Sequence, residues 1–302
     1  MSTKLKKLAD QVIVITGASS GIGLATAQSA AKQGAKVVLA ARSEKALKDV
    51  VAAINASGAD AIGVVCDVSE RTQVDKLAAD AVAKYGRIDT WVNNAGLGMW
   101  GRLDETEEAD AKRLFEVNFW GVVNGCLAAL PHLKGGGALI TVGSEVSDDS
   151  PPIQGMYTAT KHAVKGYVDS LRVEIEKVDK APVSITLIQP TAVDTPFPQH
   201  ARNFTSTEPK LPTPMIEPQQ VADAILEAAV SPTRAKTVGT MSLINTTIAK
   251  VAPSLGDKMA AKQVNRMHYD EKPRHPAGAL RQPSEATGVV GQTHGTGGKE
   301  PK

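Results

Sequence analysis

Short runs rich in β-branched residues alternate with longer Ala- and Leu-rich segments over most of this sequence. The runs are typical of buried strands, and the longer segments carry charges on one face, as amphipathic helices do. Parallel strands need crossovers of about a dozen residues or more, and right-handed crossovers place helices on both faces of one open sheet. The alternation therefore predicts an α/β fold with a doubly wound, mostly parallel sheet of about seven strands. Six predicted strands span residues 12–16, 36–40, 61–65, 90–93, 138–142 and 183–188, and the seventh lies near Thr237.

The number of domains can be judged from how far this alternation of strands and helices extends along the chain. A chain of 302 residues has room for two domains or one large one. We expect a single domain over residues 1–264, because one strand–helix series runs from residue 12 to about residue 230 and its composition favours one large α/β domain. The Pro-rich stretch 195–217 is predicted to be a substrate loop, since so long a loop in a compact domain is usually functional or disordered. Residues 265–302 are rich in Gly and Pro and are expected to be a largely disordered tail.

Charge and cysteine content exclude several classes of protein. The 34 Lys and Arg residues nearly balance 32 Asp and Glu, and no basic block is present, so we expect no nucleic-acid partner. Cys66 and Cys126 lie far apart in the sequence, and the six histidines lack metal-motif spacing, so no metal site is expected. The sequence has neither a signal peptide pattern nor an uninterrupted apolar stretch of ~18 residues. These features predict a cytoplasmic protein without a transmembrane span.

A glycine-rich turn joins the first predicted strand to the first helical pattern and has the sequence Thr-Gly-Ala-Ser-Ser-Gly-Ile-Gly. Glycines at such a turn let the backbone approach a pyrophosphate, which the free N–H groups of a helix N-terminus then hold. The spacing differs from G-x-G-x-x-G, and many α/β proteins need a tight turn there, so a purely structural role remains an alternative. As a dinucleotide site it predicts a Rossmann-type domain whose contacts are Gly17, Ser19, Ser20, Gly21, Ile22 and Gly23.

A tyrosine and a lysine one helical turn apart, Tyr157 and Lys161, suit hydride-transfer chemistry. A carbonyl that gains or loses a hydride must also exchange a proton. The ordinary pKa of tyrosine, about 10, is too high for a base at neutral pH unless a cation such as Lys161 stabilises the phenolate. Ser144, thirteen residues before Tyr157, is placed to hydrogen-bond the substrate oxygen. An isolated Tyr-x-x-x-Lys pair is ordinarily an exposed helix pair, so the inference needs the glycine-rich turn as well.

The order and spacing of these motifs, with Asn93 to Gly96 and Asn118 between them, resemble those of the short-chain dehydrogenase/reductase family over about residues 10–229. The chain looks most like bacterial NADP-dependent members that have a long Pro-rich substrate loop and a C-terminal extension. The resemblance implies that Tyr157 is the acid/base and that Lys161 lowers its pKa and binds the ribose. It also implies that Ser144 orients the substrate and that Asn118 holds a proton-relay water.

Cofactor choice depends on the end of the second predicted strand, where Ala41 stands in place of the acid expected in an NAD-specific protein. The next residue, Arg42, can bind a 2′-phosphate through two hydrogen bonds, which favours NADP(H). If Arg42 instead stacks on adenine, both cofactors would be accepted. The resemblance adds Asp67 as acceptor for the adenine amine. An equally good interpretation is that Asp67 is an acidic residue at the N-terminus of a helix, where it would stabilise the helix dipole. The remaining implied contacts are Val68, Asn94, Ala95, Gly96, Pro190, Val193 and Thr195, with Thr191 where the family usually has Gly.

The sequence therefore predicts an NADPH-dependent oxidoreductase that interconverts a carbonyl and an alcohol, with a ketone, aldehyde or secondary alcohol as substrate. We expect a homo-oligomer, because members of the family pair through their fourth and fifth helices. The substrate end should come from residues 145–154, Met156, Thr191 and the Pro-rich loop. Alternatives are an NAD-dependent dehydrogenase or epimerase of the same family, and a non-catalytic nucleotide-binding sensor.

Overall fold

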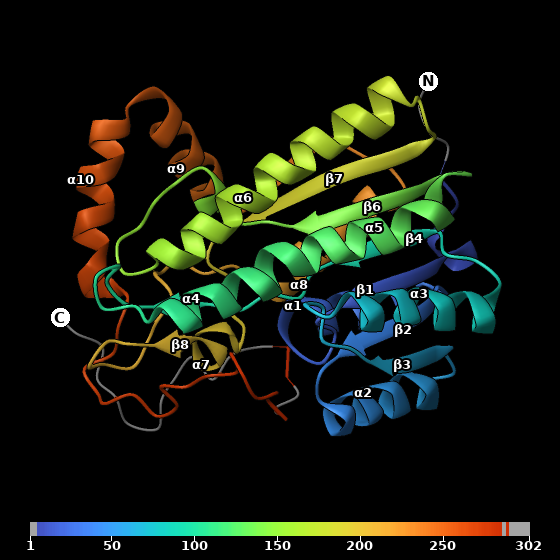
Figure 1. Cartoon of the computed structure of the whole chain (residues 1–302), viewed down its shortest axis with the longest axis horizontal. Coiled ribbons are helices and arrows are strands. Elements are labelled where there is room, and N and C mark those ends of the chain that lie inside the picture. Colours follow the sequence, from blue (N-terminus) through green and yellow to red (C-terminus); the bar gives the residue numbers. More distant parts are fainter. Residues whose placement is uncertain (1–4, 286–287, 290–302) are drawn as a thin grey trace.

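The computed structural model of the chain describes residues 5–285 and 288–289, and its centre is one sheet of parallel strands (Figure 1). The strand order is β3-β2-β1-β4-β6-β7-β9, with every neighbouring pair parallel. This order confirms the predicted Rossmann-type, doubly wound architecture. The strands are β1 (Val12–Thr16), β2 (Lys36–Ala41), β3 (Ala61–Val65), β4 (Thr90–Asn93), β6 (Gly137–Val142), β7 (Val183–Pro190) and β9 (Ala235–Val238).

Helices cover both faces of the sheet (Figure 1). One face packs against α1 (Gly21–Lys32), α2 (Glu44–Ala56) and α8 (Pro218–Ala228). The other face packs against α3 (Arg71–Tyr85), α4 (Glu108–Phe115), α5 (Gly121–Leu133) and α6 (Gly155–Arg172). Two π-helical segments, Glu116–Trp120 between α4 and α5 and Val173–Val178 after α6, extend these helices.

Strand β1 shows why the sequence reads as an unbroken apolar run. Val12 and Val14 join the core on the α3 side, whereas Ile13 and Ile15 join the core on the α1 side. Because side chains alternate across a strand and both faces are covered, every position must be apolar or paired. Each fully buried branched side chain contributes about 1.5–3 kcal/mol to folding. Burial on both sides therefore explains why the central strand is apolar at every position up to Thr16.

Further helices, turns and a pair of two-residue strands gather at the end of the sheet where the strands finish (Figure 1). The Pro-rich stretch is partly structured, with the one-turn helix α7 (Phe197–His200) and strand β8 (Arg202–Asn203), which pairs with β5 (Met99–Trp100). These elements can therefore enclose a pocket at the carboxyl ends of the sheet strands. Besides β5, α7 and β8, the elements at this end are the 3-10 turn Glu145–Ser147, α9 (Thr240–Val251), α10 (Pro253–Gln263) and the 3-10 turn Val264–Arg266. One further 3-10 turn, Leu8–Asp10, precedes β1.

The start of the expected disordered tail is structured instead. Ala279 and Leu280 are buried, with 4% and 1% of their surfaces exposed. The backbone N–H of Ala279 donates to the His200 carbonyl at 2.8 Å, and that of Asn203 donates to the Pro276 carbonyl at 2.8 Å. The expectation of disorder from residue 265 onward was thus wrong over residues 265–285, because average composition does not register a few well-placed apolar and backbone contacts. The rest of that prediction, residues 286–287 and 290–302, lies outside the described residues.

One helical stretch in the described part of the chain, Glu108–Leu133, is long and apolar enough to cross a membrane. In the fold, 67% of its apolar window is buried inside the protein. The stretch packs against the sheet and its neighbouring helices α3 and α6. Its apolar composition is therefore the one that a core helix of a sheet protein requires.

Candidate active site

The glycine-rich turn brings the end of β1 and the start of α1 into close contact. Gly17 has a φ of +66°, and a Cβ on it would lie 2.8 Å from the Cα of Ala95. A Cβ on Gly23 would lie 2.2 Å from the Gly17 carbonyl oxygen. Asn94 secures the turn, because its Nδ2 donates to the carbonyls of Thr16 at 2.9 Å and Gly17 at 3.2 Å. Glycine is thus required for a backbone cradle at the N-terminus of α1.

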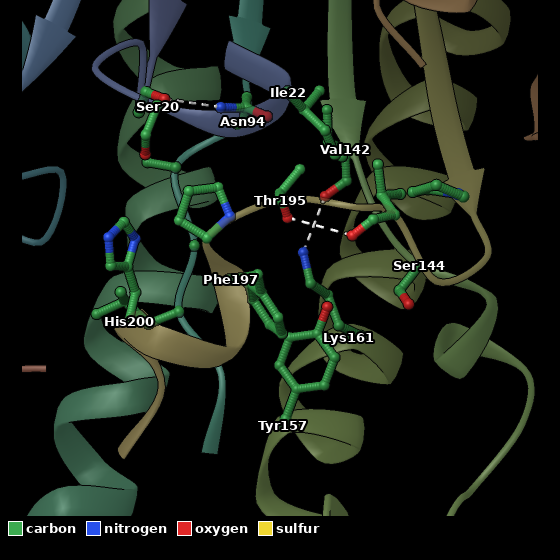
Figure 2. Close-up of a pocket in the computed structure, with 18 of the residues that line it drawn as sticks. Ser20, Ile22, Asn94, Val142, Ser144, Tyr157, Lys161, Thr195, Phe197 and His200 are labelled. Atoms are coloured by element: carbon green, nitrogen blue, oxygen red, sulfur yellow. Dashed lines mark hydrogen bonds between the residues drawn. The ribbon is translucent and has the colours of Figure 1, made fainter. Parts of the chain in front are cut away.

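A pocket lies beside this turn and is lined by nearly all of the predicted site residues (Figure 2). Gly23 and Asn118 are not among the lining residues: Gly23 supports the turn from behind, and Asn118 lies deeper in the fold. The structure therefore gathers one site from segments across the first two-thirds of the chain. Those that line it are Gly17, Ser19, Ser20, Gly21, Ile22, Arg42, Asp67, Val68, Asn94, Ala95, Gly96, Ser144, Tyr157, Lys161, Pro190, Val193 and Thr195.

Ser144, Tyr157 and Lys161 meet at one end of this pocket, where their side chains point toward one another (Figure 2). Ser144 follows β6 and caps the next turn, accepting from the N–H of Val146 at 3.3 Å. Tyr157 and Lys161 lie in the first half of α6 on the same face, with Lys161 Nζ 5.8 Å from the tyrosine ring centre. Lys161 Nζ also donates to the Val142 carbonyl at 2.9 Å. The tyrosine ring packs on Phe197 with the ring centres 5.3 Å apart.

Burial decides the protonation states of this group. Burial raises the pKa of Tyr157, the Ser144 hydrogen bond lowers it, and the nearby Glu145 carboxyl raises it further. Burial also lowers the pKa of Lys161 to about 8. The family resemblance implies a tyrosine pKa lowered by lysine, whereas in this structure burial dominates and keeps the phenol protonated at neutral pH. At neutral pH Tyr157 is therefore a protonated phenol, and Lys161 carries its positive charge below pH about 8.

Asn118 lies on the π-helical turn between α4 and α5. Its Oδ1 accepts from the N–H of Leu97 at 2.8 Å, and its Nδ2 donates to the Leu97 carbonyl at 2.9 Å and to Thr160 Oγ1 at 3.1 Å. Thr160 precedes Lys161 on α6. The Asn118 side chain therefore ties the pocket wall after β4 to the helix that carries Tyr157 and Lys161.

The far end of the pocket holds the residues predicted to contact the adenosine half of a dinucleotide. Both terminal nitrogens of Arg42 donate to backbone carbonyls late in the chain, Nη2 to Ala279 and Nη1 to Leu280, the second at 3.4 Å. Burial lowers the pKa of the Arg42 guanidinium, and the Asp67 carboxylate acts in the opposite direction. His200 lies on this side, away from Ser144 (Figure 2). The predicted phosphate-binding arginine thus already has acceptors from its own chain.

Asp67 lies in the same wall, and its carboxylate is paired with Arg113 at 2.5 Å. It also accepts from the backbone N–H and the hydroxyl of Ser69 at 3.1 and 2.8 Å. Burial would raise the pKa of Asp67, but these hydrogen bonds and the Arg113 charge outweigh it and hold the pKa below its ordinary value. Helix α3 begins at Arg71 with Glu70 as its N-cap, so Asp67 is a pocket residue rather than a helix-capping acid.

The substrate end contains a carboxyl group that sequence reasoning placed there without assigning it a role. Glu145, directly after Ser144, accepts from Thr191 Oγ1 and Asn245 Nδ2, both at 3.1 Å. Burial raises the pKa of Glu145 to about 7, partly offset by these two hydrogen bonds. Thr191, the departure from the family's usual glycine, is therefore explained by its bond to Glu145. The threonine in place of the usual glycine was the only signal of this pair in the sequence, because Glu145 and Thr191 lie 46 positions apart.

The late part of the chain also lines the pocket, which sequence reasoning missed. These residues come from α9, α10, the turn after it and the segment near residue 280. No motif marks them, because their place in the pocket depends on how distant elements pack. The additional lining residues are Asn245, Gln263, Met267, Ala279, Pro283 and Ser284.

Comparison with known proteins identifies the family of this site. Residues 11–205 match the family model described as short chain dehydrogenase, a span that holds the glycine-rich turn and all of Ser144, Tyr157 and Lys161. The chain is a short-chain dehydrogenase/reductase. YxnA, an uncharacterized oxidoreductase of Bacillus subtilis strain 168, is 44% identical to this short-chain dehydrogenase/reductase over 277 residues, which cover 90% of this chain and 78% of YxnA.

Solved structures of other short-chain enzymes share the fold. An alcohol dehydrogenase from Thermococcus sibiricus, complexed with 5-hydroxy-NADP, superposes with a TM-score of 0.66 at 30% identity, covering 76% of this chain and 94% of its own. A short-chain dehydrogenase/reductase from Burkholderia phymatum in complex with NAD gives a TM-score of 0.72 at 28% identity, with 84% and 96% covered. The predicted family and fold are therefore confirmed, and the protein is an oxidoreductase of a family that binds nicotinamide cofactors and acts on small molecules.

Proposed function

We propose that this short-chain dehydrogenase/reductase is an NADPH-dependent enzyme that interconverts a small ketone or aldehyde and the corresponding alcohol. The observation that carries the proposal is the meeting of Ser144, Tyr157 and Lys161 in the pocket that the glycine-rich turn also lines. A proton donor, a positive charge and a hydroxyl for the substrate oxygen are the groups that carbonyl reduction needs beside a hydride source.

The residues present fit a dinucleotide. The backbone cradle at Gly17 and Gly23 has no space for a side chain, and the N-terminus of the twelve-residue helix α1 opens onto it. Such a helix end attracts phosphate through its free N–H groups and its dipole. Gly17 to Ile22 would hold the pyrophosphate, and Lys161 would hold the nicotinamide ribose. NADPH bound there supplies a hydride to the carbonyl carbon.

Side chains of this protein would donate and accept the proton that the reaction requires. Ser144 would hold the substrate carbonyl oxygen, and the protonated Tyr157 would donate its proton to that oxygen as the alcohol forms. The positive charge of Lys161 would make the resulting phenolate less unfavourable. In the reverse direction Tyr157 takes the proton back. Asn118 holds the wall and the helix in register, and its proton-relay role remains a prediction.

Arg42 supports NADP(H) over NAD(H), because a guanidinium can bind a 2′-phosphate and the acid of NAD-specific proteins is replaced by Ala41. Asp67 lies beside it but is neutralised by Arg113. The similar structures from Thermococcus sibiricus and Burkholderia phymatum contain an NADP derivative and NAD respectively, so the family allows either cofactor. A homo-oligomeric state and a cytoplasmic location remain predictions from the sequence.

The test is carbonyl-dependent oxidation of NADPH and of NADH by the full-length protein, with a panel of ketones and aldehydes, beside direct binding of both cofactors. The proposal expects turnover with at least one carbonyl compound and tighter binding of NADPH. Binding without oxidation of either cofactor would favour the nucleotide-binding sensor. Substrate isomerisation without net cofactor consumption would favour an epimerase, and turnover with NADH alone an NAD-dependent dehydrogenase.

A further inference from the structure

The C-terminal strap, defined here as residues 275–285, crosses the adenosine end of the pocket. Its residues Ala279, Pro283 and Ser284 line that pocket together with Arg42 and Asp67. The strap belongs to the region after residue 205, where the match to the family model ends. It therefore lies outside the part of the chain that the family model matches, and it packs against the pocket formed by that part.

The strap uses the hydrogen-bond donors that a cofactor phosphate would need. Arg42 donates through Nη1 and Nη2 to the carbonyls of Leu280 and Ala279, so the end of the guanidinium that binds a phosphate with two parallel bonds is filled. Just beyond the strap, the Gly288 carbonyl accepts from the N–H of Gly21 at 2.7 Å, at the first residue of α1. These two contacts lie at the predicted 2′-phosphate and pyrophosphate positions.

Three anchors hold the strap in place. The Leu280 side chain is 1% exposed and is part of the hydrophobic core on the α3 side of the sheet. Arg281 binds Asp110 on α4 through two hydrogen bonds, of 2.7 and 3.1 Å. Gly278 has a φ of +54°, and a Cβ there would lie 2.3 Å from the Ala201 carbonyl oxygen. The strap is thus held by one core contact, one ion pair with the buried Asp110 carboxylate and one close backbone approach.

We infer that the strap competes with the cofactor for these donors and so sets the strength of the preference for NADPH. This inference rests on the proposed function, since it concerns the same dinucleotide site. A carbonyl oxygen and a phosphate oxygen cannot occupy the same end of the guanidinium. The phosphate forms the stronger, charge-assisted bonds, so NADPH displaces the strap from Arg42, whereas NADH has no 2′-phosphate with which to do so. The strap therefore reduces NADPH affinity and moves away from Arg42 when NADPH binds.

The first test measures dissociation constants of NADPH and NADH for full-length protein in which single anchors are removed. Leu280→Ala removes the core contact, and Arg281→Gln removes the ion pair without touching the core. Gln282→Ala, an exposed strap position that does not line the pocket, is the matched control. We expect NADPH to bind about tenfold tighter in both anchor variants, with a smaller change for NADH and none in the control. Unchanged or weaker NADPH binding in both folded anchor variants overturns the inference.

The second test follows the strap itself, by tryptic cleavage after Arg281 of the wild-type protein. Arg281 has 58% of its side chain exposed, so cleavage there reports how firmly the strap is seated. We expect NADPH to accelerate this cleavage and NADH to have a smaller effect. Protection by NADPH would overturn the inference, because it would mean that the strap closes over the bound cofactor. If neither NADPH nor NADH binds the wild-type protein or the anchor variants, the proposed function fails as well. If both bind, but with dissociation constants that do not change when the anchors are removed, only this inference is overturned.

Discussion

The two ends of the pocket are built in different ways. At the catalytic end, Ser144, Tyr157 and Lys161 come from the end of one strand and one face of the helix that follows, within eighteen positions of the sequence. At the adenosine end, Arg42 and Asp67 lie just after the strands β2 and β3, and their partners are the strap near residue 280 and Arg113. The catalytic end is thus fixed by local helical geometry, and the adenosine end by contacts between distant segments. Variants at the two ends should therefore change different measured quantities.

The largest effect is expected at the catalytic end, in Tyr157→Phe. The variant removes the proton donor but keeps the ring that packs on Phe197, so turnover should fall by ~100-fold or more with NADPH affinity nearly unchanged. Steady-state kinetics and cofactor titration measure the two quantities. Tyr167→Phe on the same helix, outside the pocket, is the control and should retain its activity. Retention of more than half the activity in Tyr157→Phe would remove this tyrosine from the mechanism.

At the adenosine end, Arg42→Asp should shift preference from NADPH toward NADH with maximal turnover largely preserved. Loss of a charge-assisted contact worth about 1.5–3 kcal/mol changes the ratio of the two dissociation constants by roughly ten- to a hundredfold. Arg71→Asp reverses an exposed charge outside the pocket and should leave the ratio where it was. An unchanged ratio in Arg42→Asp would place the phosphate elsewhere.

The pH dependence of reduction should report the buried lysine. Burial lowers the pKa of Lys161 to about 8, so the ammonium is present below that pH and is lost as the pH rises through it. Without the positive charge the phenolate is harder to form, and maximal turnover for carbonyl reduction should fall above pH about 8. A pH profile at saturating cofactor measures this fall. A rate that keeps rising above pH 8 would mean that proton donation by Tyr157 does not limit turnover.

The smallest effect concerns stability at the substrate end, through Glu145. Its pKa is about 7 in the folded protein against an ordinary 4.5, so the folded state holds the proton more tightly. The free energy of unfolding should therefore decrease as the pH rises from about 4.5 to about 7, and Glu145→Gln should lose that dependence. The expected gain of the variant near pH 7.5 is about 1–3 kcal/mol, from denaturant unfolding at several pH values. Glu70→Gln is the exposed control, and a parallel pH dependence in wild type and Glu145→Gln would contradict the assignment.

The comparison of the two ends also explains what the sequence could predict. The strands, the glycine-rich turn and the Tyr157–Lys161 pair depend on local periodicity and spacing, so the sequence carries them directly. The pairing of Asp67 with Arg113, and of Arg42 with the carbonyls of residues 279 and 280, depends on which distant segments meet in the fold. A Gly- and Pro-rich composition suggested disorder for the strap, although one buried leucine and a few backbone bonds hold it. Burial likewise raises the pKa of Tyr157, and spacing does not encode burial.

The most direct test of the central claim follows the hydride itself. NADPH labelled with deuterium at the nicotinamide C4 position would be incubated with the wild-type protein and a carbonyl compound that it reduces. The claim predicts deuterium on the carbinol carbon of the product in step with cofactor oxidation, and loss of that transfer in Tyr157→Phe while the variant still binds NADPH. Product alcohol without deuterium from either face of C4, or undiminished transfer in Tyr157→Phe, would contradict it.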